Sequence, residues 1–403
     1  MSQTLYDVGG VTYPRPFRIR RLGHFGFNLQ ALDAGLDFYG RVLGFRLADE
    51  TSLGKLMPEA AGTLEDDRLF FMTHNTDHHS FLLAHRSLGA IFGDDAASKE
   101  ITLSQITWQV GSLQEVVRAF EYFGARGIEI RRSGRDMPGS NWHVYVRDPD
   151  GHTVELYYGM EQIGIGGRSK PFDMYYRRFM DTPPLPQISD FDELAEARSR
   201  GVDVESGYAM REIGGPGQHE VEGVLLPRPF KITKIGPMAL FVGDVGVSEA
   251  FYRDVLGFTT TESVDYRGAR CVFMRHGSEH HSLKLLPRAI RDDVGLSAHS
   301  SCASMGMQVG SYRQLREAVD WLRAQGVRFV DVPAELSPGI DYCAHVLDPE
   351  GHCLQLFYAM EQVGWDGKPR PAAQRRKIQT PWPETIEPLS DTYVDQTYMG
   401  PLG

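Results

Sequence analysis

The sequence contains one pattern twice, and the two copies differ at residues that could bind a metal. The first copy carries the segments GHFGFNL, FYGRVLGF, HHSFLLAH and DPDGHTVELYY, and the second carries GPMALFV, FYRDVLGF, HHSLKLLP and DPEGHCLQLFY. Where the first copy has His24 and Glu155, the second has Pro237 and Gln355. Imidazoles and carboxylates are common ligands of divalent metals, whereas proline has no donor to offer. The first copy is therefore the candidate for chemistry, and the second for a structural partner.

The elements that must position these residues follow one order in each half, namely a strand, a helix and then about three strands, repeated once. Apolar periodicity predicts a first strand over 22–29 and a helix that ends at Gly44. A second helix is predicted over LQEVVRAFEYFGARG. The remaining strands of this half are predicted near 45–48, 69–73, 80–84, 101–110, 128–131, 143–146 and 153–158.

The spacing within the copies agrees as well as their motifs do. His24 precedes Tyr39 by 15 residues, and Pro237 precedes Tyr252 by the same number. The sequence therefore predicts an α+β fold of four βαβββ modules. We expect an N-terminal domain over 1–167 and a polar linker with a short acidic helix over 168–226. A C-terminal domain follows over 227–367, and then a C-terminal arm over 368–403, which retains Trp382.

Composition excludes several classes of function. The chain has 403 residues, of which 41% are hydrophobic and 24% charged, so it is ordinary globular protein. A net charge of −11 without a long basic run disfavours nucleic acids and anionic membranes as partners. No apolar stretch approaches the roughly 20 residues that span a bilayer. The N-terminal segment has no signal-peptide pattern, and four cysteines without CxxC spacing indicate reduced thiols in a cytoplasmic protein.

Paired βαβββ units with DPDG-H-x-x-E at the last strand and FYxxVLGF on the helix resemble the vicinal oxygen chelate superfamily. This group includes glyoxalase I, fosfomycin-resistance proteins and type I extradiol ring-cleaving dioxygenases. The resemblance covers roughly residues 20–160 and 233–360, and four units in one chain are most similar to the dioxygenases. It implies that two adjacent units form a cupped mixed sheet with a metal inside. Its ligands would come from the first strand of each unit and the last strand of the second unit.

Carried onto this sequence, the resemblance implies the ligands His24, Gln105 and Glu155, holding Fe(II), or Mn(II) or another divalent metal. The dioxygenases have histidine where this chain has Gln105, whose neutral amide is a weaker donor. Each residue also has a purely structural interpretation. His24 would then be a core imidazole, Glu155 a surface carboxylate on an edge strand, and Gln105 a hydrogen-bonding strand residue.

The resemblance also implies an acid/base role for His79 and a substrate-orienting role for Tyr145. The family histidine expected several residues before this tyrosine is missing, since Asp136, Met137 and Pro138 occupy that stretch, and His143 is a conceivable substitute. The alternatives remain open. A His-His pair recurs in the second copy as a possible fold feature, and Tyr145 would equally serve as a packing aromatic.

The leading functional hypothesis is an extradiol-type dioxygenase that cleaves a catechol-like aromatic compound with O₂, as in aromatic compound catabolism. One alternative is a glyoxalase-like lyase or isomerase, in which a divalent ion polarises vicinal oxygens without consuming O₂. Another is a protein that binds a small aromatic ligand without turnover. We expect no nucleic-acid or membrane partner, and a homo-oligomer is plausible from the edge strands and the arm.

Overall fold

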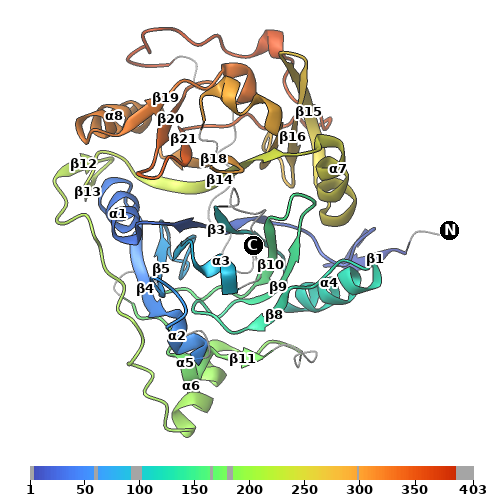
Figure 1. The fold of residues 1–403 in the computed structure, drawn as a ribbon, viewed down its shortest axis with the longest axis vertical. Coiled ribbons are helices and arrows are strands. Elements are labelled where there is room, and N and C mark those ends of the chain that lie inside the picture. Colours follow the sequence, from blue (N-terminus) through green and yellow to red (C-terminus); the bar gives the residue numbers. More distant parts are fainter. Residues whose placement is uncertain are drawn as a thin grey trace.

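Two large β-sheets are stacked, one from each half of the chain, with helices along both sides of the stack (Figure 1). The computed structural model describes residues 4–58, 62–91, 102–163, 167–178, 185–296 and 299–386. Within these residues no helix is both long and apolar enough to cross a membrane.

The N-terminal sheet has nine strands, and its centre carries the candidate site residues. The antiparallel pair β7 and β3 forms the middle, and each of them also pairs in parallel with an outer neighbour. The strands in spatial order are β11 (Arg177–Arg178), β8 (Arg132–Arg135), β9 (Trp142–Arg147), β10 (Thr153–Tyr158), β7 (Leu103–Gln109), β3 (Arg21–Leu29), β6 (Phe81–His85), β5 (Arg68–Thr73) and β4 (Arg46–Ser52).

The C-terminal sheet repeats this arrangement with eight strands, so the duplication seen in the sequence is a duplication of topology. Its strands in spatial order are β15 (Thr259–Tyr266), β16 (Ala269–Arg275), β17 (Leu283–Pro287), β14 (Ile232–Val242), β18 (Cys302–Val309), β21 (Cys353–Phe357), β20 (Cys343–Leu347) and β19 (Arg328–Val330). Two small hairpins precede the sheets, β1 (Tyr6–Val8) with β2 (Val11–Tyr13) and β12 (His219–Val221) with β13 (Val224–Leu226).

Each βαβββ module contributes one principal helix. Serine caps the two longest ones, since Ser112 accepts a hydrogen bond from the Glu115 amide and Ser311 from the Gln314 amide. The principal helices are α1 (Leu32–Asp37) with the π-helical turn η1 (Phe38–Val42), α4 (Leu113–Ala125), α7 (Val245–Ala250) with η4 (Phe251–Leu256), and α8 (Tyr312–Ala324). The shorter helices are α2 (Leu53–Leu56), α3 (Leu88–Ile91), α5 (Phe172–Tyr175), α6 (Asp190–Ser199), η5 (Arg288–Ile290), η6 (Asp292–Val294), η7 (Ala334–Leu336) and η8 (Ala372–Gln374).

One hydrophobic core joins the two halves, because alternate residues of both central strand pairs face each other. Phe27 of β3 stacks on His352 of the other half with 4.2 Å between ring centroids. Trp108 of β7 meets Phe258 edge-on at 4.9 Å. The opposite face of each sheet points away from the partner half. We call these two faces the N-terminal cup, which includes His24, and the C-terminal cup.

The repeated motifs also fasten the halves to each other. The Tyr39 hydroxyl of FYGRVLGF donates to Asp348 of the DPEG turn at 2.9 Å. Reciprocally, the Tyr252 hydroxyl of FYRDVLGF donates to Asp148 of the DPDG turn at 3.0 Å. All four side chains are buried. We call these two hydrogen bonds the reciprocal clasp, and they give the motifs a structural purpose apart from any chemistry.

Most of the expected elements are found, and one strand is displaced. The strand predicted at 128–131 is wrong, because β8 spans Arg132–Arg135, where it pairs with β9. Ile128 and Ile130 instead pack at the edge of the core. The acidic linker helix is confirmed as α6. Trp382 of the arm packs on Tyr342 of its own half at 5.4 Å. The rest of the arm, 387–403, lies outside the described residues.

Candidate active site in the N-terminal cup

His24 and Glu155 meet at the centre of the N-terminal cup although 131 residues separate them in the chain. His24 Nε2 lies 3.0 Å from Glu155 Oε2, and both side chains are almost completely buried. They come from β3 and β10, which flank β7 on either side. The interpretation of Glu155 as a surface carboxylate on an edge strand therefore does not describe this structure, whereas that of His24 as a core imidazole agrees with it.

Thr107, rather than Gln105, lies between these two residues. On β7, Thr107 pairs with both His24 and Glu155, and its hydroxyl donates to Glu155 Oε2 at 2.8 Å. Gln105 pairs with Gly26, farther along the strands, and is only partly buried. A register shift beside Gly26 accompanies this offset. The ligand role of Gln105 stays a prediction, and the structure adds Thr107 as the nearer donor.

The second oxygen of Glu155 is held by a residue that sequence reasoning missed. Asn141 Nδ2 donates to Glu155 Oε1 at 2.8 Å, and His143 Nδ1 lies 3.7 Å from the same oxygen. Burial by itself would raise the pKa of Glu155, but His24, His143 and the Thr107 hydroxyl outweigh it and lower that pKa. Glu155 is therefore an ionised carboxylate with a fixed orientation.

His79 lies beside His24, with 4.4 Å between ring centroids and the planes inclined by 62°. Its Nδ1 is 3.0 Å from Nδ1 of His78, whose Nε2 lies 3.3 Å from Asp49. Burial, followed by repulsion from His24 and His78, keeps the pKa of His79 well below its usual value. The imidazole is thus neutral near neutral pH and able to accept a proton.

The His-His pair itself is a feature of the fold. In the C-terminal half His280 Nδ1 lies 3.0 Å from His281 Nδ1, and His280 Nε2 lies 2.9 Å from Glu262. The same pair with the same carboxylate support therefore occurs in a cup without the metal-binding residues. What distinguishes His79 is its neighbour His24, because the residue equivalent to His24 in the second half is Pro237.

Tyr145 and His143 stand on β9, next to Glu155. Tyr145 is paired with Glu155 across β9 and β10, and the rings of Tyr145 and His143 are 4.7 Å apart. Burial, then the Glu155 carboxylate, raise the pKa of Tyr145 well above its usual value, so its phenol stays protonated. Asp136 lies 3.1 Å from His143 Nε2 and pairs with Arg132. Asp136 thus contacts the site from the stretch where the family histidine is missing.

The donors in this cup fit a divalent ion at two positions. His24 Nε2 and Glu155 Oε2 are hydrogen-bonded at 3.0 Å, and two ligands about 2.1 Å from one ion and at right angles would be about the same distance apart. The third neighbour is the neutral Thr107 hydroxyl, a weaker donor than an imidazole. Among the described residues no group of three or more His, Cys, Asp or Glu side chains is arranged to hold a metal. His79 and His143 are close by, but among the described residues neither is arranged with His24 and Glu155 as in a two-histidine, one-carboxylate site.

The C-terminal cup carries a lysine that sequence comparison of the copies did not single out. Lys284 of β17 occupies the position that Leu82 holds in β6, as the pairing of Gly26 with Leu82 and of Ala239 with Lys284 shows. Lys284 Nζ donates to Gln355 Oε1 at 2.8 Å, and the side chain is buried. Burial lowers the pKa of Lys284 to about 8. An ammonium group thus lies beside the residue that replaces Glu155.

The chain matches the family model of the Glyoxalase/Bleomycin resistance protein/Dioxygenase superfamily over residues 21–156 and 234–356. It belongs to this superfamily. Each of the two matched stretches contains one cup. The match therefore includes both copies of the repeat and the candidate site. The vicinal oxygen chelate fold predicted from the repeated motifs is confirmed.

Named relatives of the chain are catechol dioxygenases. It is 28% identical to a 3-methylcatechol 2,3-dioxygenase of Pseudomonas putida over 35% of this chain, a match that spans 43% of that relative's length. It is 22% identical to a catechol-2,3-dioxygenase of Bacillus subtilis over 66% of this chain and 73% of that protein. The crystal structure of the 2,3-dioxygenase LapB from a Pseudomonas species covers 88% of this chain and 96% of its own, with 14% identity and a TM-score of 0.54. This structural likeness concerns the fold alone.

Proposed function

We propose that the N-terminal cup is the active site of an extradiol-type dioxygenase that opens the ring of a catechol-like substrate with O₂. The observation that supports this most is the convergence of His24 and Glu155 in one cup, beside His79 and Tyr145. The relatives named as catechol dioxygenases support the same chemistry.

His24 and Glu155 would hold a divalent ion, Fe(II) or Mn(II), with the Thr107 hydroxyl or the Gln105 amide as a weaker third donor. When bound, such an ion supplies a positive centre at which a diol and O₂ are brought together. The protein's own contribution is orientation. Asn141 and Thr107 fix the Glu155 carboxylate by hydrogen bonds at 2.8 Å, so it does not reorganise when a cation binds.

His79 and Tyr145 act on the substrate. His79 is a neutral, buried imidazole, so it takes a proton from one hydroxyl of the diol and returns it later to the product. Tyr145 keeps its phenol proton and donates a hydrogen bond to a substrate oxygen. His143 lies between Asp136 and Glu155 and positions the carboxylate from its second side.

The test is oxygen consumption after anaerobic loading with Fe(II) or Mn(II), using a panel of catechols. The expected result is O₂ uptake with at least one catechol and a ring-opened product that contains both oxygen atoms. Variants at Glu155 and at Gln355 serve as a matched pair, because the two residues are equivalent in the two halves. Activity lost in Glu155→Ala and kept in Gln355→Ala supports the assignment, and equal effects of both overturn it.

Thr107 favours a second candidate, a glyoxalase-like lyase or isomerase. A hydroxyl in place of a second imidazole leaves a harder and less electron-rich donor set, which suits a redox-inactive ion that only polarises vicinal oxygens. The same oxygen electrode separates the two candidates. Turnover of a substrate without O₂ uptake would assign the isomerase-type reaction to this cup.

A further inference from the structure

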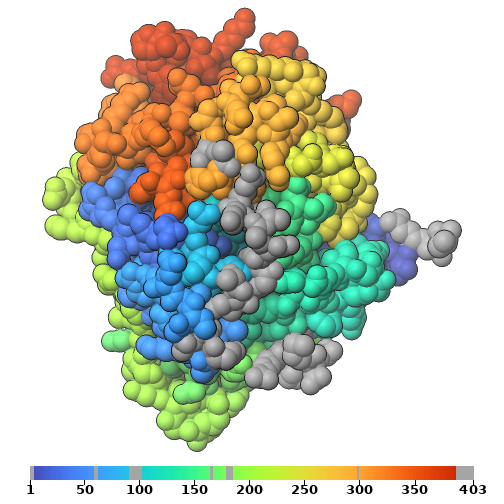
Figure 2. Space-filling model, viewed as in Figure 1, coloured from blue at the N-terminus to red at the C-terminus, as the bar shows by residue number. Residues whose placement is uncertain are grey.

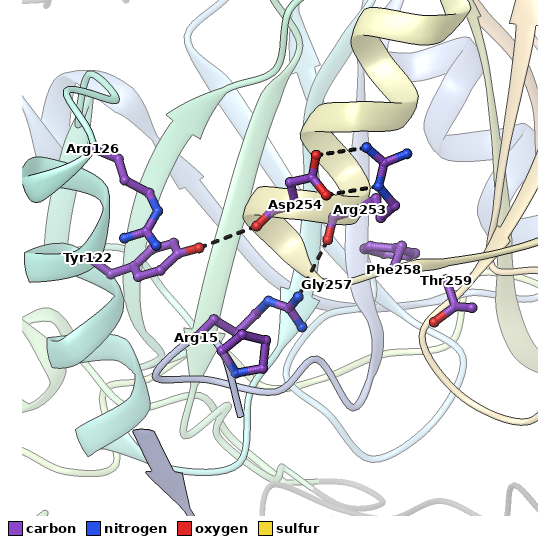
Figure 3. Close-up of a pocket in the computed structure, with 9 residues that line it drawn as sticks. Arg15, Tyr122, Arg126, Arg253, Asp254, Gly257, Phe258 and Thr259 are labelled. Carbon is purple, nitrogen blue, oxygen red and sulfur yellow. Dashed lines mark hydrogen bonds and ion pairs between the residues drawn. The ribbon is translucent and has the colours of Figure 1, made fainter. Parts of the chain in front are cut away.

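A cavity of about 450 Å³ opens between the two halves, away from both cups. Figure 3 shows it where the end of α4 approaches η4. Three arginines line it, namely Arg15 before β3, Arg126 after α4 and Arg253 on η4. Asp254 is the only carboxylate in its lining. A pocket with an excess of positive charge is unexpected in a chain whose net charge is −11.

The carboxylate of Asp254 is already paired with an arginine. Both oxygens of Asp254 accept hydrogen bonds from the neighbouring Arg253, one from Nε and one from Nη2, each at 2.8 Å. Within the part of the chain that the structure describes, Arg15 and Arg126 form no ion pair. Three guanidinium groups against one carboxylate leave the lining with an excess of two positive charges, although Asp254 partly offsets the charge of Arg15.

Arg15 is the more buried of these two. Its Nη2 donates to the Arg253 carbonyl at 3.4 Å, while its Nε is buried without a hydrogen-bond partner. The side chain lies across Gly257, where a Cβ atom would come within 2.0 Å of Nη1. Burial lowers the pKa of Arg15, because its charge is only partly compensated. A bound anion would supply the missing partner.

Arg126 is held in place by Tyr122. Its guanidinium carbon is 3.6 Å from the centroid of the Tyr122 ring, a cation–π contact that leaves the N–H groups at the edge free to face a ligand. The Tyr122 hydroxyl in turn donates to the Asp254 carbonyl of the other half at 3.4 Å. The cavity is thus built from both halves and has a defined shape.

The duplication gives this cavity a counterpart between α8 and η1, and there protein side chains occupy the corresponding space. There Arg228 lies across Gly44 as Arg15 lies across Gly257. The arginine–glycine contact is therefore a repeated feature of the fold and does not by itself indicate a ligand. Gln325 stands where the first site has Arg126, and it accepts a hydrogen bond from Arg41 at 3.0 Å.

The linker completes this second place. Glu212 lies 4.0 Å from the Arg228 guanidinium. Ile213 packs so close to η1 that a Cβ atom on Gly40 would come within 2.5 Å of its side chain. The cavity at Arg15 therefore differs from this place in its additional arginine and in having no linker residues among its lining residues.

We propose that this cavity is a binding site for a doubly charged oxyanion of the phosphate class, held by Arg15 and Arg126 of the N-terminal half where this half meets the C-terminal half. Guanidinium groups match the oxygens of phosphate in a bidentate manner, and an excess of two positive charges matches a dianion. The ligand would be inorganic phosphate or the phosphate group of a small metabolite. Because it would bind only the folded chain, it would stabilise that state by mass action.

The experiment is thermal unfolding and isothermal titration calorimetry of the full chain with inorganic phosphate, against chloride at equal ionic strength. The wild type is expected to show a saturable rise in its melting temperature and a measurable heat of binding. Arg126→Gln, which copies Gln325, is expected to weaken the affinity about tenfold. Arg323→Gln is the control, because Arg323 occupies the last turn of α8, is exposed and does not line the cavity.

Two results would overturn the proposal. One is a phosphate response no larger than that of chloride, and the other is equal phosphate affinity in the wild type and in Arg126→Gln. Phenyl phosphate separates the two sources of the anion. Tighter binding than inorganic phosphate would indicate an ester whose organic part contacts Tyr122 and Phe258, and equal binding would indicate the free anion. Because Arg126 lies outside both cups, activity of the N-terminal cup is expected to be unchanged in this variant.

Discussion

The two cups show how one scaffold is adapted in opposite ways. In the N-terminal cup His24 and Glu155 converge at 3.0 Å, which suits a cation from solution. In the C-terminal cup Gln355 is neutral, and the Lys284 ammonium lies 2.8 Å from its amide oxygen. The second cup thus carries its own cation on a side chain.

Removing the Glu155 carboxylate should have the largest effect, because it would abolish the difference in metal binding between the two cups. In Glu155→Ala the hydrogen bonds from Asn141 and Thr107 lose their acceptor, and the candidate metal site loses its charged donor. We expect catalytic activity to fall about a thousandfold and bound metal to be lost from the purified, metal-loaded protein. Gln355→Ala is the control and should leave both unchanged. Stoichiometric metal retained by Glu155→Ala would contradict the ligand assignment.

Replacing the lysine tests the other side of the comparison. The pKa of Lys284 is about 8 in the folded protein, below its ordinary value of 10.5, so the buried charge destabilises the folded state. This penalty is fully present below pH 8 and disappears as the pH rises to 10.5. It amounts to about 3 kcal/mol.

Lys284→Leu, which copies Leu82, should remove this pH dependence. We expect the free energy of unfolding of the wild type to rise relative to that of the variant between pH 8 and 10.5, as measured by denaturant titration at several pH values. Comparing the two proteins cancels the other groups that titrate in this range. A difference that stays constant over this range would show that Lys284 is not a buried ammonium.

The reciprocal clasp should behave alike in both halves, in contrast to the cups. Tyr39→Phe and Tyr252→Phe each remove one buried hydrogen bond to an aspartate, at 2.9 and 3.0 Å respectively. Each substitution should lower the free energy of unfolding by about 2 kcal/mol. Effects that differ by more than about 1 kcal/mol would show that the two junctions are not equivalent in energy.

The smallest effect is expected at Tyr145. Tyr145→Phe keeps the ring and removes only the hydroxyl, so activity should fall about tenfold while metal content stays the same. His345→Phe, at the corresponding position of the C-terminal cup, should leave activity unchanged. Equal activity of Tyr145→Phe and the wild type would assign this residue to packing alone.

The sequence was sufficient for the modules and for the contrast between the cups, because motif spacing and ligand types can be read along one chain. Thr107 was missed because its place opposite both His24 and Glu155 follows from the pairing of three strands, which the residue pattern does not reveal. Lys284 was missed because a lysine on a strand is typical of an exposed face, and nothing in the residue pattern marks this one as buried. The reciprocal clasp joins residues more than 100 positions apart, so local sequence patterns could not predict it.

The central claim is that a divalent ion binds in one cup and not in the other. An anomalous-scattering map of crystals grown from Mn(II)-loaded protein tests it most directly. We expect a single strong peak within bonding distance of His24 Nε2 and Glu155 Oε2, and none near Gln355 and Lys284. A map with no peak at His24 and Glu155, or with a peak in the C-terminal cup, would contradict it.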